Sequence, residues 1–223
     1  LFFTLVICLF IKTNAQDGPV SPYSYFGLGT FNPANTVENN AMGGLSIYGD
    51  SIHVNLQNPA SYGLLKLTTY TVGVSHRRMA LTSDTQEKST ALTAIDYLSV
   101  AMPIAENIGI GFGITPVTSM GYILNSSAEN ANGETITNVF SGDGGLSKIY
   151  FSLGAAPIKN FTAGASAFAN FGTVNKERVQ SLSSVLFGTI DRRTSRMNGF
   201  NFQMAANYTP NITDKLTLYT SFV

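Results

Sequence analysis

The sequence predicts an all-β chain whose antiparallel strands form a transmembrane β-barrel behind an irregular N-terminal segment. Apolar residues alternate with small or polar ones along segments of about 10–14 residues, which is long enough for tilted membrane strands. Short turns recur at nearly equal intervals, beginning at Pro103, Pro157 and Pro210. The connections at the opposite strand ends read as long and polar. Short turns at one end and long loops at the other are typical of bacterial outer-membrane barrels.

Residues 1–15 predict a secretory signal peptide. An apolar run over residues 1–11 is followed by Lys12 and by the sequence Thr-Asn-Ala, which favours cleavage after Ala15. The run is shorter than the roughly 20 apolar residues that a membrane-spanning helix needs. The alternative is a buried helix or an anchor. Export by a signal peptide, together with the barrel pattern, predicts the bacterial cell outer membrane as the location of the mature chain.

Composition narrows the class of protein further. The chain has 13 basic and 13 acidic residues, and this zero net charge gives no case for nucleic-acid binding. Charged residues make up only 12% of the chain, well below the usual share in soluble domains. The single cysteine, Cys8, lies in the leader, so a disulfide scaffold is excluded. No pattern indicates a cofactor.

Residues 16–62 do not alternate and are rich in Gly, Asn, Pro and Ser. They also carry apolar residues that need burial, such as Phe26, Leu28 and Ile47. We expect a compact, irregular segment packed against something larger. Its hinge points are Gly43 and Gly44, because glycine reaches conformations closed to other residues.

Residues 63–223 carry the strand pattern. Strands are expected near 66–79, 91–103, 108–115, 148–155, 161–170 and 200–208, with another from 215 onward. About seven strands are an incomplete set, because single-chain bacterial barrels close with an even count. An open sheet in lipid would leave backbone groups unpaired. We therefore expect the remaining strands to lie beyond this sequence.

The alternation also predicts which side chains face lipid and which face the lumen. Ile110, Phe112, Phe151 and Phe202 are expected to face lipid. Gly111, Tyr150 and Gln203 are expected to face inward. Arg77, Asp96 and Lys148 are candidate lumen residues near the outer rim, where the cations either tune selectivity or pair with Asp96.

The polar stretches at about 80–90, 124–145 and 175–195 are expected to be long outer loops, because they hold most of the charges and the Asn-Gly and Gly-Asp-Gly-Gly signals. Apolar residues within them, Phe140, Leu186 and Phe187, either line an outer apolar pocket or fold the loops onto the rim. Arg192, Arg193 and Arg196 either face lipopolysaccharide phosphates or form a solvated loop edge.

Motifs for catalysis or metal binding are not found. His53 and His76 have no second ligand at helical or hairpin spacing, so no metal site is predicted. The glycines of residues 109–113 lack the spacing of a phosphate-binding loop and open no helix. No Ser/His/Asp set is recognisable, and we expect a protein that is not an enzyme.

The N-terminal sequence resembles a known family. Asn40-Ala-Met-Gly-Gly-Leu-Ser-Ile-Tyr-Gly-Asp50, with Asn58-Pro-Ala60 ahead of the first strand, resembles the start of FadL-type outer-membrane transporters. Ser21-Pro-Tyr-Ser-Tyr-Phe-Gly-Leu-Gly29 is similar to the mature N-terminus of such barrels in the Bacteroidota.

This resemblance implies that residues 16–62 form a hatch inside a barrel that begins at residue 63. Asn58, Pro59 and Ala60 would then lie at the junction of hatch and barrel. The implied function is porin-like lipid transport, in which hydrophobic small molecules of the long-chain fatty-acid type diffuse passively. The implied partners are membrane lipid and a hydrophobic ligand. The alternative is a non-transport barrel that binds other proteins in secretion or surface assembly.

Overall fold

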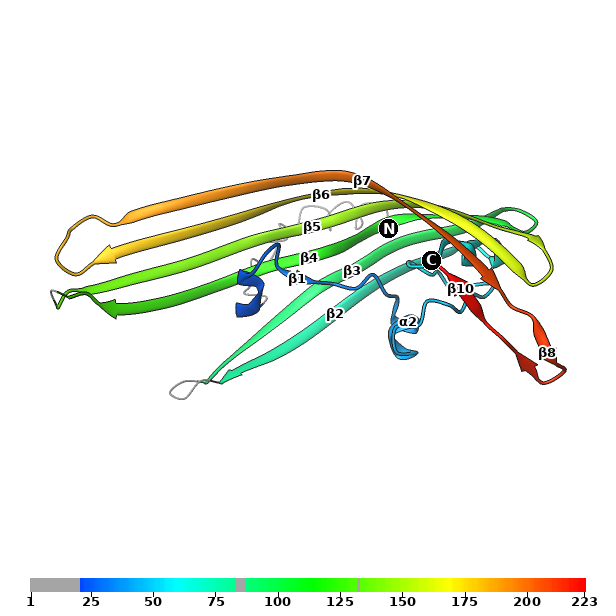
Figure 1. Cartoon of the computed structure of the whole chain (residues 1–223), viewed down its shortest axis with the longest axis horizontal. Helices are drawn as coiled ribbons and strands as arrows, with labels where there is room; N and C mark the ends of the chain where they lie inside the picture. Colours follow the sequence, from blue (N-terminus) through cyan, green and yellow to red (C-terminus); the bar gives the residue numbers. More distant parts are fainter. Residues whose placement is uncertain (1–20, 83–86, 132) are drawn as a thin grey trace, which may run out of the picture.

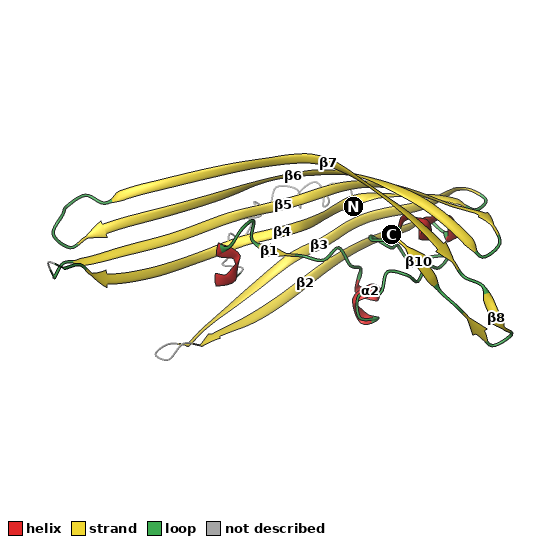
Figure 2. Ribbon diagram, in the orientation of Figure 1, coloured by secondary structure: helices red, strands yellow, loops and turns green. Residues whose placement is uncertain are grey.

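A computed structural model describes residues 21–82, 87–131 and 133–223 of the chain. The described residues form one curled antiparallel sheet, with short helices and loops of the N-terminal segment lying along its concave side (Figures 1 and 2). The all-β, antiparallel prediction is confirmed. The predicted leader at residues 1–15 lies outside the described residues. Within them, no helix is both long enough and apolar enough to cross a bilayer.

The main sheet is a series of neighbouring hairpins. Its spatial order is β10-β7-β6-β5-β4-β3-β2, and β1 pairs with β4 off this path. The strands are β1 (Thr30–Phe31), β2 (Thr69–Thr82), β3 (Glu87–Ala105), β4 (Ile108–Glu129), β5 (Thr135–Ile158), β6 (Phe161–Leu182), β7 (Thr189–Tyr208) and β10 (Thr220–Phe222). A separate small hairpin joins β8 (Asn211–Thr213) to β9 (Leu216–Thr217).

Two of the predicted short turns are two-residue hairpin loops. Ala105 pairs with Ile108 across the first, and Ile158 with Phe161 across the second. Asn107 and Asn160 occupy equivalent positions, each with φ of 64°. Asparagine tolerates this left-handed conformation better than most residues, which suits it to the one loop position whose φ is positive.

The predicted long outer loops are largely wrong. Residues 124–129 and 135–145 continue β4 and β5, and Leu124 pairs with Phe140 across them. Residues 175–182 and 189–195 likewise continue β6 and β7, and the loops near residues 130–134 and 183–188 are short. At the remaining predicted loop, β2 runs to Thr82 and β3 begins at Glu87. Polar composition suggested loops here, but pairing satisfies the backbone groups whatever the side chains are.

The Gly-Asp-Gly-Gly stretch lies inside β5 rather than at a turn. A Cβ atom at Gly142 would lie 2.4 Å from the Tyr122 ring. One at Gly144, whose φ is 111°, would lie 2.1 Å from the Thr173 carbonyl oxygen. Close approach of neighbouring groups therefore accounts for these glycines.

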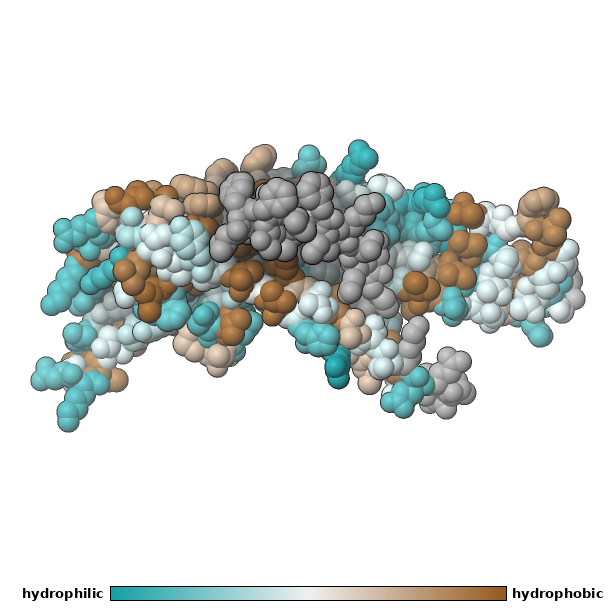
Figure 3. All heavy atoms as spheres, turned by 180° about the vertical axis from the view of Figure 1, so that it is seen from behind, coloured by the Kyte–Doolittle hydropathy of each residue, from teal (hydrophilic) through white to brown (hydrophobic). Residues whose placement is uncertain are grey.

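The two faces of the sheet differ in chemistry. Directly paired residues of neighbouring strands share a face. One such row on the convex face joins Phe112, Phe151 and Phe202, which are 42%, 52% and 78% exposed. The neighbouring row, one residue along each strand, joins Gly111, Ser152 and other small residues on the concave face. The view from behind shows apolar side chains along the sheet and a group of hydrophilic ones at one end, while the other end is mostly pale or apolar (Figure 3).

The sheet divides between β3 and β4. Their pairing ends at Leu98 and Ile114, although both strands continue. Beyond this point β3 pairs with β2, and β4 pairs with β5. Strand β1 lies along β4 in the part where β3 has left it, with Phe31 paired to Thr118 and Thr30 to Ser119 (Figure 1).

The N-terminal segment supplies the remaining elements: η1 (Pro22–Tyr25), α2 (Val37–Ala41) and η2 (Pro59–Leu64). The main apolar cluster lies between this segment and the concave face. It consists of Val54, Leu56, Tyr62, Leu65, Tyr97, Ala101, Tyr150 and Phe168.

Candidate functional site

The N-terminal segment contacts the concave face at two places, and we define these as the lower and the upper attachment. The lower attachment consists of Asn58 and η2, which lie near the short turns. The upper attachment consists of residues 21–32, with η1 and β1. Together they position the features through which the chain could act on another molecule.

The lower attachment lies in a trough lined by strand glycines. A Cβ atom at Gly164 would lie 2.4 Å from the carbonyl carbon and oxygen of Pro59. One at Gly109 would lie 2.1 Å from the Tyr62 carbonyl oxygen, and one at Gly154 would lie 2.4 Å from the Pro59 oxygen. Backbone therefore packs directly on backbone, and glycine is required because any side chain would displace η2.

Asn58 holds η2 with both ends of its amide. The side chain is fully buried, and its Oδ1 accepts a hydrogen bond of 3.1 Å from the Ala60 backbone N–H, capping η2. Its Nδ2 donates to Asn207 Oδ1 at 2.9 Å and to Ser221 Oγ at 3.1 Å. Because β7 carries Asn207 and β10 carries Ser221, this residue joins the segment to the last strands of the sheet.

Tyr62 places a large ring in the same trough. Its hydroxyl donates to the Tyr150 hydroxyl at 3.5 Å, and the Tyr150 hydroxyl also hydrogen-bonds Ser99 on β3. A Cβ atom at Gly111 would lie 2.1 Å from the Tyr62 ring. Ring packing and hydrogen bonds therefore fix the same contact.

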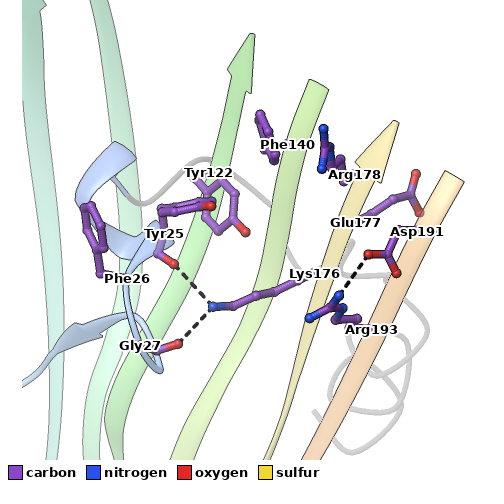
Figure 4. A pocket seen from close by; sticks show the side chains of 10 residues that line it. All are labelled: Tyr25, Phe26, Gly27, Tyr122, Phe140, Lys176, Glu177, Arg178, Asp191 and Arg193. Carbon is purple, nitrogen blue, oxygen red and sulfur yellow. Dashed lines mark hydrogen bonds and ion pairs between the residues drawn. The ribbon is translucent and has the colours of Figure 1, made fainter. Parts of the chain in front are cut away.

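The upper attachment includes contacts made by exposed side chains (Figure 4). Lys176 on β6 donates hydrogen bonds to the backbone oxygens of Tyr25, at 3.3 Å, and Gly27, at 3.1 Å. Its ammonium group also lies 5.9 Å from the centre of the Tyr25 ring. That ring packs edge-on against Tyr122 and Phe140, with centroid distances of 5.2 Å and 6.2 Å.

These residues border an open hollow of about 440 Å³ on the concave side. Charged side chains of β6 and β7 form its other wall. Arg178 lies 5.4 Å from the Phe140 ring centre, and Arg193 pairs with Asp191 at 3.2 Å. Aromatic rings on one side and cations on the other suit contact with a polypeptide better than with a purely apolar molecule.

A second hollow lies between α2 and the loop that follows it. Asp50 accepts hydrogen bonds from the backbone N–H groups of Ile52 and His53 and contacts the His53 ring. The hydrogen bond that the His53 ring donates to Asp50 raises the pKa of His53, although partial burial opposes it. Partial burial acts to raise the pKa of Asp50, but the hydrogen bonds from His53 outweigh it, so the Asp50 pKa is lowered. The described residues contain no cluster of three or more metal-type ligands.

The structure separates the sequence-predicted candidates. Gly43 and Gly44 have φ of 76° and 84°, in the turn after α2. Asn58, Pro59 and Ala60 lie together in the lower attachment. Sequence reasoning noted the strand glycines of residues 109–113 but missed the trough. The trough depends on which strands neighbour each other, and this is not visible in the sequence.

The predicted charged residues do not form one group. Arg77 lies 3.8 Å from Asp96, so it takes the pairing alternative. Lys148 instead lies 4.7 Å from the centre of the Phe168 ring. Both pairs lie on the concave side, as does the buried Tyr150.

The residues predicted to form an outer apolar pocket are not brought together either. Phe140 lies in the upper hollow beside Tyr25. Leu186 and Phe187 lie in the β6–β7 loop and are 91% and 81% exposed. Of the three predicted arginines, Arg192 and Arg193 form ion pairs within this hairpin region.

The fold and its attachments define a curled antiparallel sheet whose concave face is occupied by its own N-terminal segment. The chain belongs to the BamG family, whose match covers residues 1–223. This is a family of the outer-membrane protein assembly machinery. No curated protein and no solved structure matches the chain.

The family match corrects several expectations from sequence. The chain is not a FadL-type transporter, and the passive transport of fatty-acid-like molecules is overturned with it. Membrane lipid, a hydrophobic ligand and lipopolysaccharide are likewise withdrawn as functional partners, because the family match indicates protein partners instead. The resemblance to FadL-type transporters rested on short motifs rich in Gly and Asn. Such motifs reflect the packing of an N-terminal segment against a curled sheet, so they carry no information about function.

Proposed function

We propose that this chain acts in outer-membrane protein assembly by binding other proteins of the assembly machinery or their substrates. The observation that carries this proposal is the family match along the whole chain. The described residues support it indirectly, because their concave hollow mixes aromatic and charged groups. A hollow of this kind is suited to binding a polypeptide.

We further propose that the sheet spans the outer membrane with the N-terminal segment as its hatch. The apolar rows of the convex face run along β6 from Phe161 to Phe171. That stretch is about 35 Å long at roughly 3.3 Å per residue. A tilt of about 40° reduces it to roughly 27 Å, close to the apolar band of known outer-membrane barrels.

Beyond this band the β4–β5 and β6–β7 hairpins project as arms. Their convex surface carries polar pairs: Asn175 donates to Asp143 at 3.0 Å, and Arg192 donates to Glu177 at 2.6 Å. The arms extend the sheet by about ten residues per strand, or roughly 33 Å. We propose that they form the surface that contacts partner proteins outside the membrane.

Depletion of the protein tests the assembly function. Controlled shut-off of expression should lower the amounts of several unrelated outer-membrane proteins together, as measured by quantitative proteomics of isolated outer membranes. Periplasmic proteins serve as the internal control. Unchanged outer-membrane proteins after complete depletion would contradict the proposal.

The route of export is tested separately. We propose that residues 1–15 are removed as a signal peptide, so that the mature chain begins at Gln16. Mass spectrometry of the N-terminal peptide from outer membranes measures this directly. Retention of the leader, or an acylated chain that begins at Cys8, would overturn it.

A further inference from the structure

The inner edge of β4 is the feature that the proposed function leaves unexplained. Pairing between β3 and β4 ends at Leu98 and Ile114, yet β4 continues to Glu129. On the opposite side β4 remains paired with β5 along its whole length, to the pair Glu129 and Thr135. The free edge of β4 therefore faces the gap that opens where β3 and β4 separate.

The upper attachment already uses the first part of this edge. The Asn32 N–H donates to the Val117 carbonyl at 2.9 Å, and the Ser21 N–H donates to the Gly121 carbonyl at 3.0 Å. The Gly121 N–H in turn donates to Ser24 Oγ at 3.1 Å. These contacts establish that the edge can bind an extended segment through its backbone.

The same edge continues past Gly121 without a paired strand among the described residues. Backbone groups of a strand turn to the same side at every second residue. Since both backbone groups of Gly121 point to this side, those of Ile123, Asn125 and Ser127 do so as well. All three side chains are exposed. Unpaired strand edges of this kind bind added strands.

We propose that the β4 edge at residues 123–127 is a docking site for an extended segment of a substrate protein, which adds to the sheet as a strand between β3 and β4. The inference rests on the proposed role in outer-membrane protein assembly and names its substrate class. Substrate barrel strands fit this site because they are extended and alternate in polarity. Continuity with the pairing of β1 gives the direction and register in which such a strand would lie.

The upper attachment would then limit access to the site. Strand β1 makes only two paired positions, and Lys176 holds the preceding residues through two hydrogen bonds. The lower attachment keeps the segment in place when these contacts open. A strand entering at residues 123–127 could extend along β4 by displacing Thr30 and Phe31.

Photo-crosslinking of the purified full chain tests the site. A benzophenone amino acid is introduced at residue 125 or, as a matched control, at Val179, which lies in the same row of the sheet but in a strand paired on both sides. The probe is a synthetic peptide of about 12 residues with strictly alternating apolar and polar side chains. We expect at least tenfold more cross-linked product from position 125 than from position 179.

Two further cross-linking experiments show whether backbone hydrogen bonds hold the peptide. A peptide N-methylated along one edge should lose the cross-link, because it cannot pair. Asn125→Pro removes an N–H that faces the free edge and leaves the β5 pairing intact, so it should weaken cross-linking from position 127 by a similar factor. Equal yields at 125 and 179, or indifference to both changes, would overturn the proposal.

The outcomes separate this inference from the function on which it rests. If depletion lowers outer-membrane proteins while the peptide fails to cross-link at 125, only the docking site is wrong. If the peptide binds as expected while depletion has no effect, the edge binds strands but the assembly role is wrong.

Discussion

The two attachments of the N-terminal segment differ in how they are held. At the lower attachment, backbone packs on backbone in a glycine-lined trough, and the buried Asn58 amide joins η2 to two strands. At the upper attachment, the contact is carried by two paired residues of β1, by the hydrogen bonds of Ser21 and Ser24 to Gly121 and by the exposed Lys176 side chain. The difference indicates a segment that is fixed at one end and exchangeable at the other, as a gate over a binding edge requires.

The largest effect is expected from filling the trough. Gly164→Val places a side chain where the Pro59 carbonyl now lies, 2.4 Å from the added Cβ, so η2 must move. Overpacking of this kind costs about 3 kcal/mol of unfolding free energy. Urea unfolding, followed by protease resistance of the segment, measures it.

Gly199→Val is the matched control for this variant. Gly199 is a strand glycine with nothing within 4 Å of its added Cβ. Valine suits a strand, so this variant should be as stable as the original chain. Equal losses from both variants would show that the trough has no special role.

The next effect is expected from Asn58→Ala. The change removes the cap of η2 and leaves the buried Asn207 amide oxygen with one partner fewer. Loss of a cap together with a weakened buried polar group costs about 2 kcal/mol. Asn40→Ala, an exposed amide in the same segment, should change the unfolding midpoint very little. The two midpoints are compared under identical conditions, and indistinguishable values would count against the role of Asn58 in holding η2.

A smaller effect on stability is expected from Lys176→Met. Exposed cation contacts contribute less than about 1 kcal/mol, so global unfolding should hardly change. Release of the Tyr25 and Gly27 carbonyls should nevertheless speed chymotrypsin cleavage after Tyr25 and Phe26. Lys159→Met, at an exposed turn, is the control. The account requires faster cleavage in the first variant only.

The smallest effect concerns pH. The His53 pKa is raised, so its contribution is present below pH about 6.5 and is lost as pH rises through the higher folded value. The Asp50 pKa is lowered, so its contribution is lost only as pH falls through the folded value, below about 4. The pair therefore stabilises the loop best between these limits.

NMR titration of the His53 ring measures this directly. Its midpoint should lie above the ordinary histidine value and return toward it in Asp50→Asn. An unchanged midpoint in that variant would remove the Asp50 contact as the cause.

Sequence reasoning recovered the parts of the fold that local chemistry determines. The alternation from Ile108 to Ile114 predicted a strand, and the turns after Pro103 and Pro157 were placed correctly. The arms were missed because polar residues and glycines interrupt their apolar residues, although Met120, Tyr122 and Val174 pack together in a buried cluster. Only pairing with a neighbour makes a strand of such a sequence.

The site was less predictable than the fold. Asn58, Pro59 and Ala60 stood out through a motif, but the family that the motif suggested was wrong. The contact of Lys176 with Tyr25 joins residues 151 positions apart, and the pairing of β1 with β4 involves only two residues. Contacts between residues so far apart in the sequence, and pairings of so few residues, leave no periodic signal in a sequence.

Hydrogen exchange of backbone amides tests the contrast between the two attachments most directly. The purified protein is exposed to deuterated buffer, and exchange is compared between the Ser61 and Leu65 amides of the lower attachment and the Ser21 and Asn32 amides of the upper one. All four donate backbone hydrogen bonds, so equal protection would be expected from hydrogen bonding alone. The account predicts exchange at least about tenfold faster at the upper attachment, because local opening there breaks few contacts. Equal rates at both ends, or faster exchange at Ser61 and Leu65, would contradict it.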